Sequence, residues 1–182
     1  MVSIHGLELN LGDRCMKKYG NIKIRKAKIE DMEQLCKARN NEKLFAGYLS
    51  ECDGEKAHFL VAEIDEEIVG FGLVYLDVTK TGKKKSHLPK LSDLYVVEGC
   101  RRKGVATALI QARETLAKQY GYSQIYVSID PSESPEMIAL AKKLSYMPLQ
   151  EKPYPVSALY YDSQGQAYEK NYFRLDFKKD LL

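Results

Sequence analysis

Hydrophobic and polar residues follow two different periods along this chain. Apolar residues alternate with basic ones over 22–27 and with polar ones over 124–129, the pattern of a strand with one buried face. From Ile29 and again from Val105, apolar residues recur every three or four positions, which predicts helices with one packing face. Apolar runs bounded by turn residues predict further strands at 59–64, 68–76, 91–97, 146–150 and 172–177, and further helices at 44–49 and from 135.

The predicted elements suggest one α/β domain. Their order is strand, helices, three strands, helix, strand, helix and two strands, with a long tyrosine-rich loop between the last two strands. At 182 residues the chain is long enough for one well-filled core. Residues 1–20 have weak periodicity and three glycines, so we expect an N-terminal extension there and the domain over 21–182.

Composition excludes several functional classes. Hydrophobic residues make up 45% and charged residues 29% of the chain, as in ordinary globular proteins. No apolar run approaches the roughly 20 residues of a membrane helix, and the first eleven residues do not form a secretory signal, so we expect a cytoplasmic protein. A formal charge of +3 gives no basis for nucleic-acid binding. The four cysteines are scattered and the histidines number three, which favours free thiols and no metal site.

The most informative segment is 94–106, where a strand leads through three basic residues into a helix. A helix start exposes unpaired backbone N–H groups and the positive end of the helix dipole. Gly104 permits close backbone approach, Ala106 keeps the first turn narrow, and the basic residues 101–103 add positive charge. These features predict a site for a pyrophosphate.

Other phosphate-binding motifs fit this chain less well. Gly99 and Gly104 have the spacing of a P-loop, but Val105 and Ala106 replace the lysine and hydroxyl residue that such a loop needs. The glycines of 70–72 lie inside a predicted strand without the third glycine of a dinucleotide fingerprint. The remaining alternative is an ordinary helix start with surface arginines.

The sequence Arg101-x-x-Gly104-x-Ala106 resembles the Gln/Arg-x-x-Gly-x-Gly/Ala motif of the GNAT superfamily of N-acetyltransferases. The resemblance spans about 22–178 and includes the opening strand and helix, the hairpin, and Ser134-x-x-x-Ile138-Ala139-Leu140 before Tyr146. It implies a GNAT-like single α/β (α+β) domain. Its mixed central sheet would have about six to seven strands, flanked by about four helices.

The resemblance also implies acetyl-coenzyme A as the acyl donor, with its pyrophosphate on the motif turn and its pantetheine arm along the preceding strand. Main-chain groups of that strand would be free, and an N–H near Val96 would polarise the thioester carbonyl. The expected activity is transfer of acetyl to a primary amine of a small molecule or protein. The alternative is a non-catalytic acyl-coenzyme A-binding or sensing module. The implied cofactor-binding residues are Leu94, Val96, Val97, Arg101, Arg102, Lys103, Gly104, Val105, Ala106, Thr107 and Ser134.

The chain departs from the family pattern where proton transfer is expected. Many relatives have asparagine at the position of Ser134 and a tyrosine acid at the position of Ala141. Ser92 stands where some polyamine-acetylating relatives carry a glutamate base, so it is the catalytic candidate, through a bound water. Strand alternation points Ser92 and Asp93 to opposite faces, and Asp93 could act only if a bulge turned it inward.

The tyrosines of the last segment suit simple packing of the final strands or either of two functional uses. Relatives shape the acceptor pocket or a homodimer contact with this region, and the tyrosine ring suits either. We expect Cys100 to be a buried, inert thiol, and the lysines of 80–85 to be a solvated connection. The identity of the amine acceptor does not follow from the sequence, because acceptor pockets use variable loops.

Overall fold

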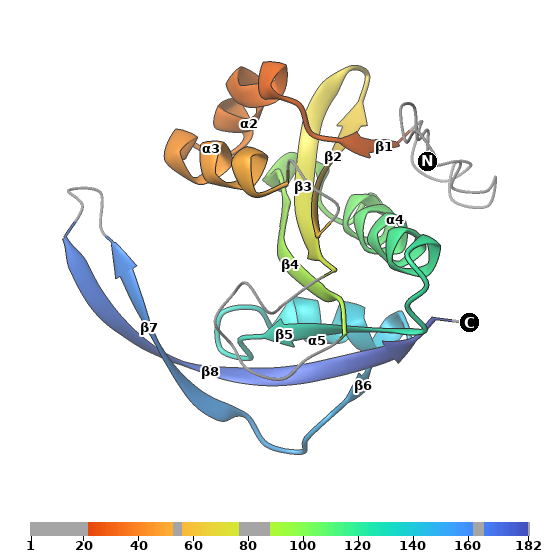
Figure 1. Ribbon diagram of the computed structural model, residues 1–182, viewed down its shortest axis with the longest axis vertical. Coiled ribbons are helices and arrows are strands. Elements are labelled where there is room, and N and C mark those ends of the chain that lie inside the picture. The colour runs from red at the N-terminus through yellow and green to blue at the C-terminus, as the bar shows by residue number, and fades with distance from the viewer. Residues whose placement is uncertain (1–21, 53–55, 77–87, 162–165, 182) are drawn as a thin grey trace.

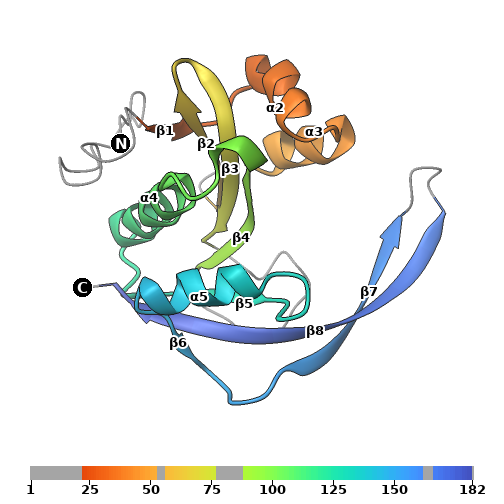
Figure 2. The ribbon, with the colours of Figure 1, turned by 180° about the vertical axis from the view of Figure 1, so that it is seen from behind.

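A computed structural model describes residues 22–52, 56–76, 88–161 and 166–181 (Figures 1 and 2). The N-terminal extension expected at 1–20 and the lysine run of 80–85 lie outside these ranges. The described residues form four α-helices, α2 (Met32–Ala38), α3 (Glu42–Glu51), α4 (Val105–Gln119) and α5 (Pro135–Lys143). Their strands are β1 (Lys23–Lys26), β2 (Ala57–Ile64), β3 (Glu67–Tyr75), β4 (Lys90–Val96), β5 (Gln124–Ile129), β6 (Met147–Pro148), β7 (Tyr154–Tyr161) and β8 (Ala167–Asp180).

The strands form one mixed sheet in the order β1-β2-β3-β4-β5-β8-β6, and β7 pairs with β8. The pair β4–β5 is parallel and the other pairs are antiparallel. Figure 1 shows α2 and α3 on one side of β2 and β3, and α4 on the other side. The predicted mixed α/β fold, with about four helices on a central sheet, is therefore confirmed.

Each side of the sheet has its own hydrophobic core. On one side α4 buries Ala108, Leu109, Ala112 and Leu116, the packing face that the helical period predicted. On the other side Phe45 of α3 packs against β2 and β3, with its ring centroid 5.2 Å from that of Phe71. The two cores fix the helices on opposite faces of β3 and β4, so the two faces of β4 meet different surroundings.

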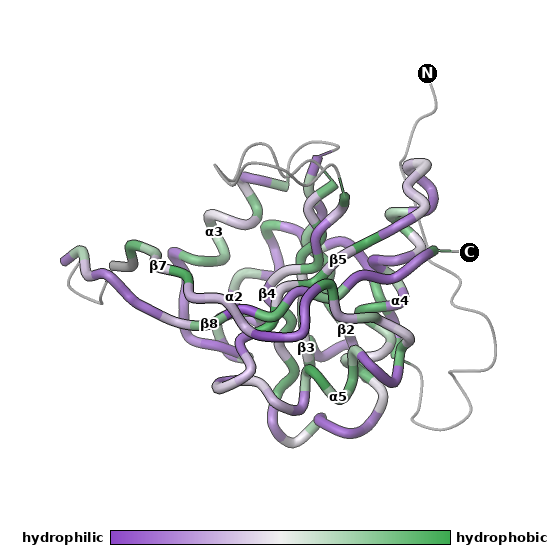
Figure 3. The backbone as a smooth tube through the Cα atoms, turned by 90° about the horizontal axis from the view of Figure 1, so that it is seen from below, coloured by the Kyte–Doolittle hydropathy of each residue, from purple (hydrophilic) through white to green (hydrophobic). Residues whose placement is uncertain are grey.

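The predicted tyrosine-rich loop is wrong, because the structure forms a hairpin there. β7 pairs along its whole length with the first half of β8 (Figure 1). Figure 3 shows this hairpin projecting from the body, with hydrophilic and hydrophobic residues interspersed along it. Both of its faces are largely exposed, and Leu159 and Phe173 are 62% and 50% accessible. The hairpin lies on the side of the sheet that carries α2 and α3.

No helix within the described ranges is both long and apolar enough to cross a membrane. The three cysteines that the structure describes, Cys36, Cys52 and Cys100, are free and half-buried. Cys100 packs beside the core under α4 and is half-buried, so the expectation of a buried thiol is met only in part.

A buried histidine in β2 makes stability depend on pH. His58 is 2% exposed, its ring lies 5.3 Å from that of Tyr120, and its Nε2 has no hydrogen-bond partner among the described residues. Burial lowers the pKa of His58 from 6.5 to about 4. The unfolded chain therefore binds a proton at a pH where the folded chain does not. The stability that this difference provides is present above pH 6.5 and is lost as pH falls towards 4.

We expect the free energy of unfolding to fall by up to about 3 kcal/mol across that window through this residue. His58→Leu removes the ionisable group from the same apolar site, so its stability should depend less on pH there. Urea unfolding of both proteins at neutral pH and near pH 4.5 measures the difference. Parallel losses in the two proteins would show that His58 does not drive the acid destabilisation.

Candidate active site

The candidate site begins where β4 and β5 separate. The two strands pair only at Lys90–Tyr126 and Leu91–Val127, although β4 continues to Val96 and β5 to Ile129. Beyond this point no strand of the described ranges pairs with the edge of β4 that faces β5. Unpaired main-chain groups on such an edge are ready to bind an extended ligand.

The hydrogen bonds of β4 show which main-chain groups face that open edge. The N–H of Val97 donates to the carbonyl of Val69 in β3, at 2.9 Å. The main-chain N–H and C=O groups of successive strand residues point to alternate edges of the strand. Those of Val96 and Leu94 therefore point away from β3. The expectation that Val97 has free main-chain groups is corrected, since its carbonyl also accepts a bond from Cys100 N–H at 2.9 Å.

A bulge interrupts β4 at Asp93. Phe71 pairs with Tyr95 and Leu73 with Ser92, so Asp93 and Leu94 together oppose the single residue Gly72. Asp93 has a φ of 36°, in the left-handed region that aspartate tolerates better than most residues. The predicted alternation of Ser92 and Asp93 is therefore wrong, because the extra residue re-aims the side chain.

The bulge directs Asp93 towards α2 and α3. Its Oδ2 accepts a 2.7 Å hydrogen bond from the Tyr48 hydroxyl, and its Oδ1 lies 3.3 Å from Nη1 of Arg39. Burial, and then the neighbouring Asp93, raise the pKa of Tyr48 above its ordinary value, so the phenol keeps its proton and donates. The Asp93 side chain is 25% exposed. A carboxylate held by two donors and still open to solvent can accept a proton from a bound amine.

The motif turn leads from β4 into α4 through two residues with left-handed backbone. Arg102 has a φ of 60° and Gly104, which precedes the first residue of the helix, has a φ of 90°. The first bond into the helix runs from Ala108 N–H to the Gly104 carbonyl at 2.9 Å. The N–H groups of 105–107 therefore have no acceptor within the helix. Successive N–H groups without helical acceptors are suited to binding an anion.

The three basic residues of the turn behave differently. Nε of Arg101 donates to the carbonyl of Val96 at 3.1 Å, which ties the turn to the end of β4. All three side chains, Arg101, Arg102 and Lys103, are exposed. Arg102 and Lys103 supply positive charge beside the N-terminus of α4. The Arg101 side chain also caps the end of β4 by its hydrogen bond to Val96.

A glycine sets the distance between this turn and the sheet. A Cβ on Gly70 would lie 2.8 Å from the Tyr95 carbonyl and 3.2 Å from Cγ1 of Val105. The first turn of α4 can therefore pack directly on β3 beside β4. The anion site and the open edge of β4 lie next to each other, so their arrangement fits acetyl-coenzyme A, which carries a pyrophosphate at one end of an extended amide-containing arm.

The structure places the two departures from the family pattern just before α5 and within it. Ser134 is the residue before the helix and Pro135 is its first residue, as predicted, but the Ser134 side chain makes no capping hydrogen bond. Ala141 is 1% exposed and carries no proton donor. The nearby Tyr146 is buried with its hydroxyl 2.8 Å from Oε1 of Glu114, so it is part of the core.

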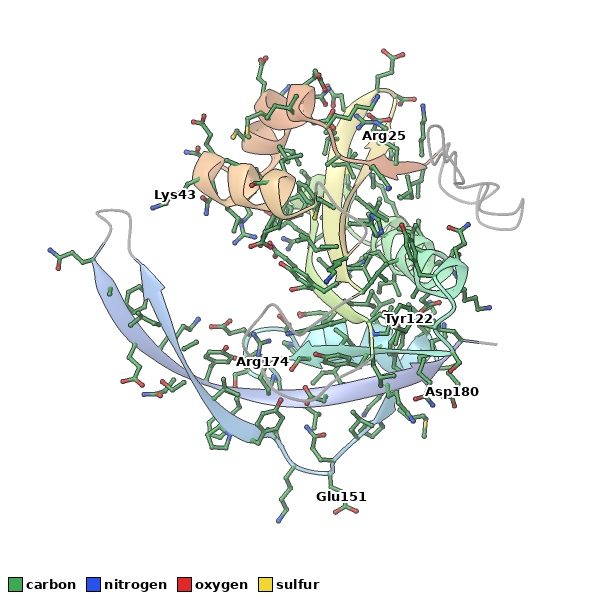
Figure 4. All side chains as sticks on the ribbon, in the orientation of Figure 1. Arg25, Lys43, Tyr122, Glu151, Arg174 and Asp180 are labelled. Carbon is green, nitrogen blue, oxygen red and sulfur yellow. The ribbon has the colours of Figure 1, made fainter. Side chains whose placement is uncertain are left out.

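A second polar group at the strand separation was not found from the sequence. Ser128 follows Val127, the last residue of β5 that pairs with β4. It donates to Asp176 of β8, and the Tyr154 hydroxyl donates to the same carboxylate at 2.8 Å. Arg174, labelled in Figure 4, donates to the Ser128 carbonyl at 3.2 Å. Burial, and then Asp176, raise the pKa of Tyr154. The crowding of tyrosines in the sequence pointed to this region. The register of β7 and β8, which brings Tyr154 to Asp176, could not be read from the sequence.

Known proteins resemble this chain in sequence and in fold. The family model described as Acetyltransferase (GNAT) family matches residues 25–146. An N-alpha-acetyltransferase of Sulfurisphaera tokodaii is 32% identical, covering 71% of this chain and 83% of that protein.

Two solved structures share the fold. An N-acetyltransferase from Staphylococcus aureus Mu50 has a TM-score of 0.66 at 18% identity, over 90% of this chain and all of that one. A putative acetyltransferase from Salmonella typhimurium, solved with its cofactor acetyl-coenzyme A, has a TM-score of 0.63 at 14% identity, over 88% of this chain and 94% of that one. By the family model and the 32% identical relative, the chain belongs to the acetyltransferase (GNAT) family, and acetyl-coenzyme A is the acyl donor of that family.

Proposed function

We propose that this protein transfers an acetyl group from acetyl-coenzyme A to the free α-amino group of a polypeptide. The observation that carries the proposal is the continuity of β4. One strand bears the Asp93 carboxylate on the α2–α3 face, an edge without a partner strand in the described ranges, and a left-handed turn into the start of α4 at its end. The name of the 32% identical relative, N-alpha-acetyltransferase, supports the choice of an α-amine among primary amines.

The cofactor is assigned to the turn and the strand edge. The open N–H groups of 105–107, with Gly104 giving access and Arg102 and Lys103 adding charge, would bind the pyrophosphate. The edge of β4 at Leu94 and Val96 would hydrogen-bond the amide-containing arm through its remaining main-chain groups, because the Val96 carbonyl already accepts a bond from Arg101. Bound in this way, acetyl-coenzyme A supplies the acetyl group as a thioester.

The chain contributes proton transfer and carbonyl polarisation. An amine arrives mostly protonated at neutral pH and must lose a proton to become a nucleophile. Asp93 accepts that proton directly or through a water bound at Ser92. An N–H on the open edge beside Val96 polarises the thioester carbonyl. As the new C–N bond forms and the C–S bond breaks, the nitrogen would release its second proton to solvent water, and water would protonate the departing thiolate, because Ala141 offers no donor.

Thiol release with synthetic peptides tests the acceptor. We expect coenzyme A release with a peptide that has a free N-terminus, and mass spectrometry should locate the acetyl group on that terminus. The matched control is the same lysine-containing peptide with an acetylated N-terminus, which should give no release. Equal coenzyme A release with both peptides would contradict the α-amine proposal and would identify the lysine side chain as the acceptor.

A non-catalytic acyl-coenzyme A-binding module is the second candidate, and the alanine at 141 is the observation that favours it. That alternative would be supported if acetyl-coenzyme A bound tightly but no coenzyme A was released in the presence of free-terminus peptides or small primary amines. Together, the peptide pair and a small-amine panel separate the two candidates.

A further inference from the structure

Helix α4 carries a buried arginine beneath the β4 bulge. Arg113 is 0% exposed and lies on the apolar packing face of the helix. Its Nε donates to the Leu109 carbonyl at 3.0 Å, and its Nη2 has no hydrogen-bond partner in the part of the chain that the structure describes. No described carboxylate pairs with it, and burial lowers the pKa of Arg113 to about 10. A buried charge without a counter-ion is costly, so its contacts need an explanation.

Those contacts converge on the two strands at the bulge. Nη1 of Arg113 donates to the Leu73 carbonyl of β3 at 2.9 Å and to the Ser92 carbonyl of β4 at 3.1 Å. Leu73 and Ser92 are the last cross-strand pair before the extra residue. A single nitrogen therefore bridges the two strands at the residue where their regular pairing stops.

The residue opposite the bulge leaves room for this guanidinium. An ideal Cβ on Gly72 would lie 2.8 Å from both Cζ and Nη1 of Arg113. The guanidinium thus occupies the space that a side chain at position 72 would fill. Gly72 lies opposite both Asp93 and Leu94, the two residues of the bulge. The glycine, the buried arginine and the bulge therefore lie at one place in the sheet.

We propose that Arg113 is a positioning residue that holds the β4 bulge at Asp93 and thereby sets where the Asp93 carboxylate lies. Regular pairing could replace a bulge by a one-residue slip of register, which would turn Asp93 to the other face. The bridge from Nη1 to both carbonyls opposes that slip. Small apolar residues at 72 and 113 would fill the same volume without burying a charge. The arginine is therefore explained by the bulge carbonyls that it satisfies.

This inference rests on the proposed role of Asp93, and its test has one readout that does not need activity. Backbone NMR of Asp93 and Leu94 reports the left-handed conformation at the bulge. In Arg113→Met we expect those signals to move to values of extended backbone. We also expect kcat to fall by about 10- to 100-fold, with the KM for acetyl-coenzyme A nearly unchanged, because the carboxylate is displaced and the cofactor turn is not.

Two variants and a control complete the design. Arg113→Lys keeps a donor that reaches one carbonyl, so it should recover part of kcat. Gly72→Ala forces the guanidinium away and should give the same NMR change and kcat loss as Arg113→Met. Tyr146→Phe removes another buried hydrogen bond of this core, to Glu114, and should lower stability without changing the Asp93 signals or kcat.

Unchanged Asp93 and Leu94 signals with parental kcat in Arg113→Met would overturn the inference. If that variant does not fold, the Gly72→Ala/Arg113→Met double variant decides in the same way, because the new methyl group takes the space of the guanidinium. An inactive parent would instead count against the proposed function. The NMR change in that inactive protein would still test whether Arg113 holds the bulge.

Discussion

Replacing Asp93 with asparagine is expected to lower kcat by about 10²- to 10⁴-fold, the range by which general acid–base groups contribute to catalysis. The amide has the size of the carboxylate and can still accept the 2.7 Å hydrogen bond from Tyr48. It cannot accept the proton of an incoming ammonium. The affinity for acetyl-coenzyme A should stay within about three-fold, because the turn at the end of β4 is unchanged.

The matched control for this change is Asp65→Asn. Asp65 is an exposed aspartate with a φ of 51° in the turn between β2 and β3, so its backbone strain resembles that of Asp93. Steady-state thiol release with a free-terminus peptide should be parental in the control. A folded Asp93→Asn protein with parental kcat would remove Asp93 from proton transfer.

The second large effect is expected at Gly104. Gly104→Val should weaken acetyl-coenzyme A binding by about 10- to 100-fold, or roughly 1.4 to 2.8 kcal/mol. A β-branched residue is strained at a φ of 90°, and its side chain would stand over the open N–H groups of the helix start. Calorimetric titration of the variant measures the loss.

The control for Gly104→Val is a second left-handed glycine, which lies at the C-terminal end of α4. Gly121 follows the helix with a φ of 84°, and nothing lies within 4 Å of a Cβ built on it. Gly121→Val should lower stability through the same backbone strain but leave acetyl-coenzyme A affinity parental. Equal affinities in all three proteins would place the pyrophosphate away from Gly104.

The sequence predicted the parts of the fold in which one face is buried. Over β5 the buried residues are Ile125, Val127 and Ile129, and this strict alternation is visible without a structure. The buried face of α4 likewise has the period of a helix. β7 was missed because its hairpin with β8 projects from the body and leaves both faces largely exposed. Burial therefore imposed no period on its residues.

The candidate site was predictable where it depends on local backbone and not where it depends on pairing. The turn around Gly104 follows from residues adjacent in sequence, and the structure has a left-handed residue there. The bulge at Asp93 depends on the partner strand and on Arg113, which is 20 positions further along the chain. In sequence, that arginine only interrupts an apolar helix face. Side-chain contacts across the sheet explain it.

Calorimetric titration of the parent protein with acetyl-coenzyme A is the most direct test of the central claim, that the turn and open edge of β4 form the site of the acyl donor. We predict saturable binding to one site and a rise in the melting temperature that grows with ligand concentration through mass action. Absence of both heat and thermal shift at about millimolar acetyl-coenzyme A would contradict the claim, because any useful affinity produces a shift at that concentration.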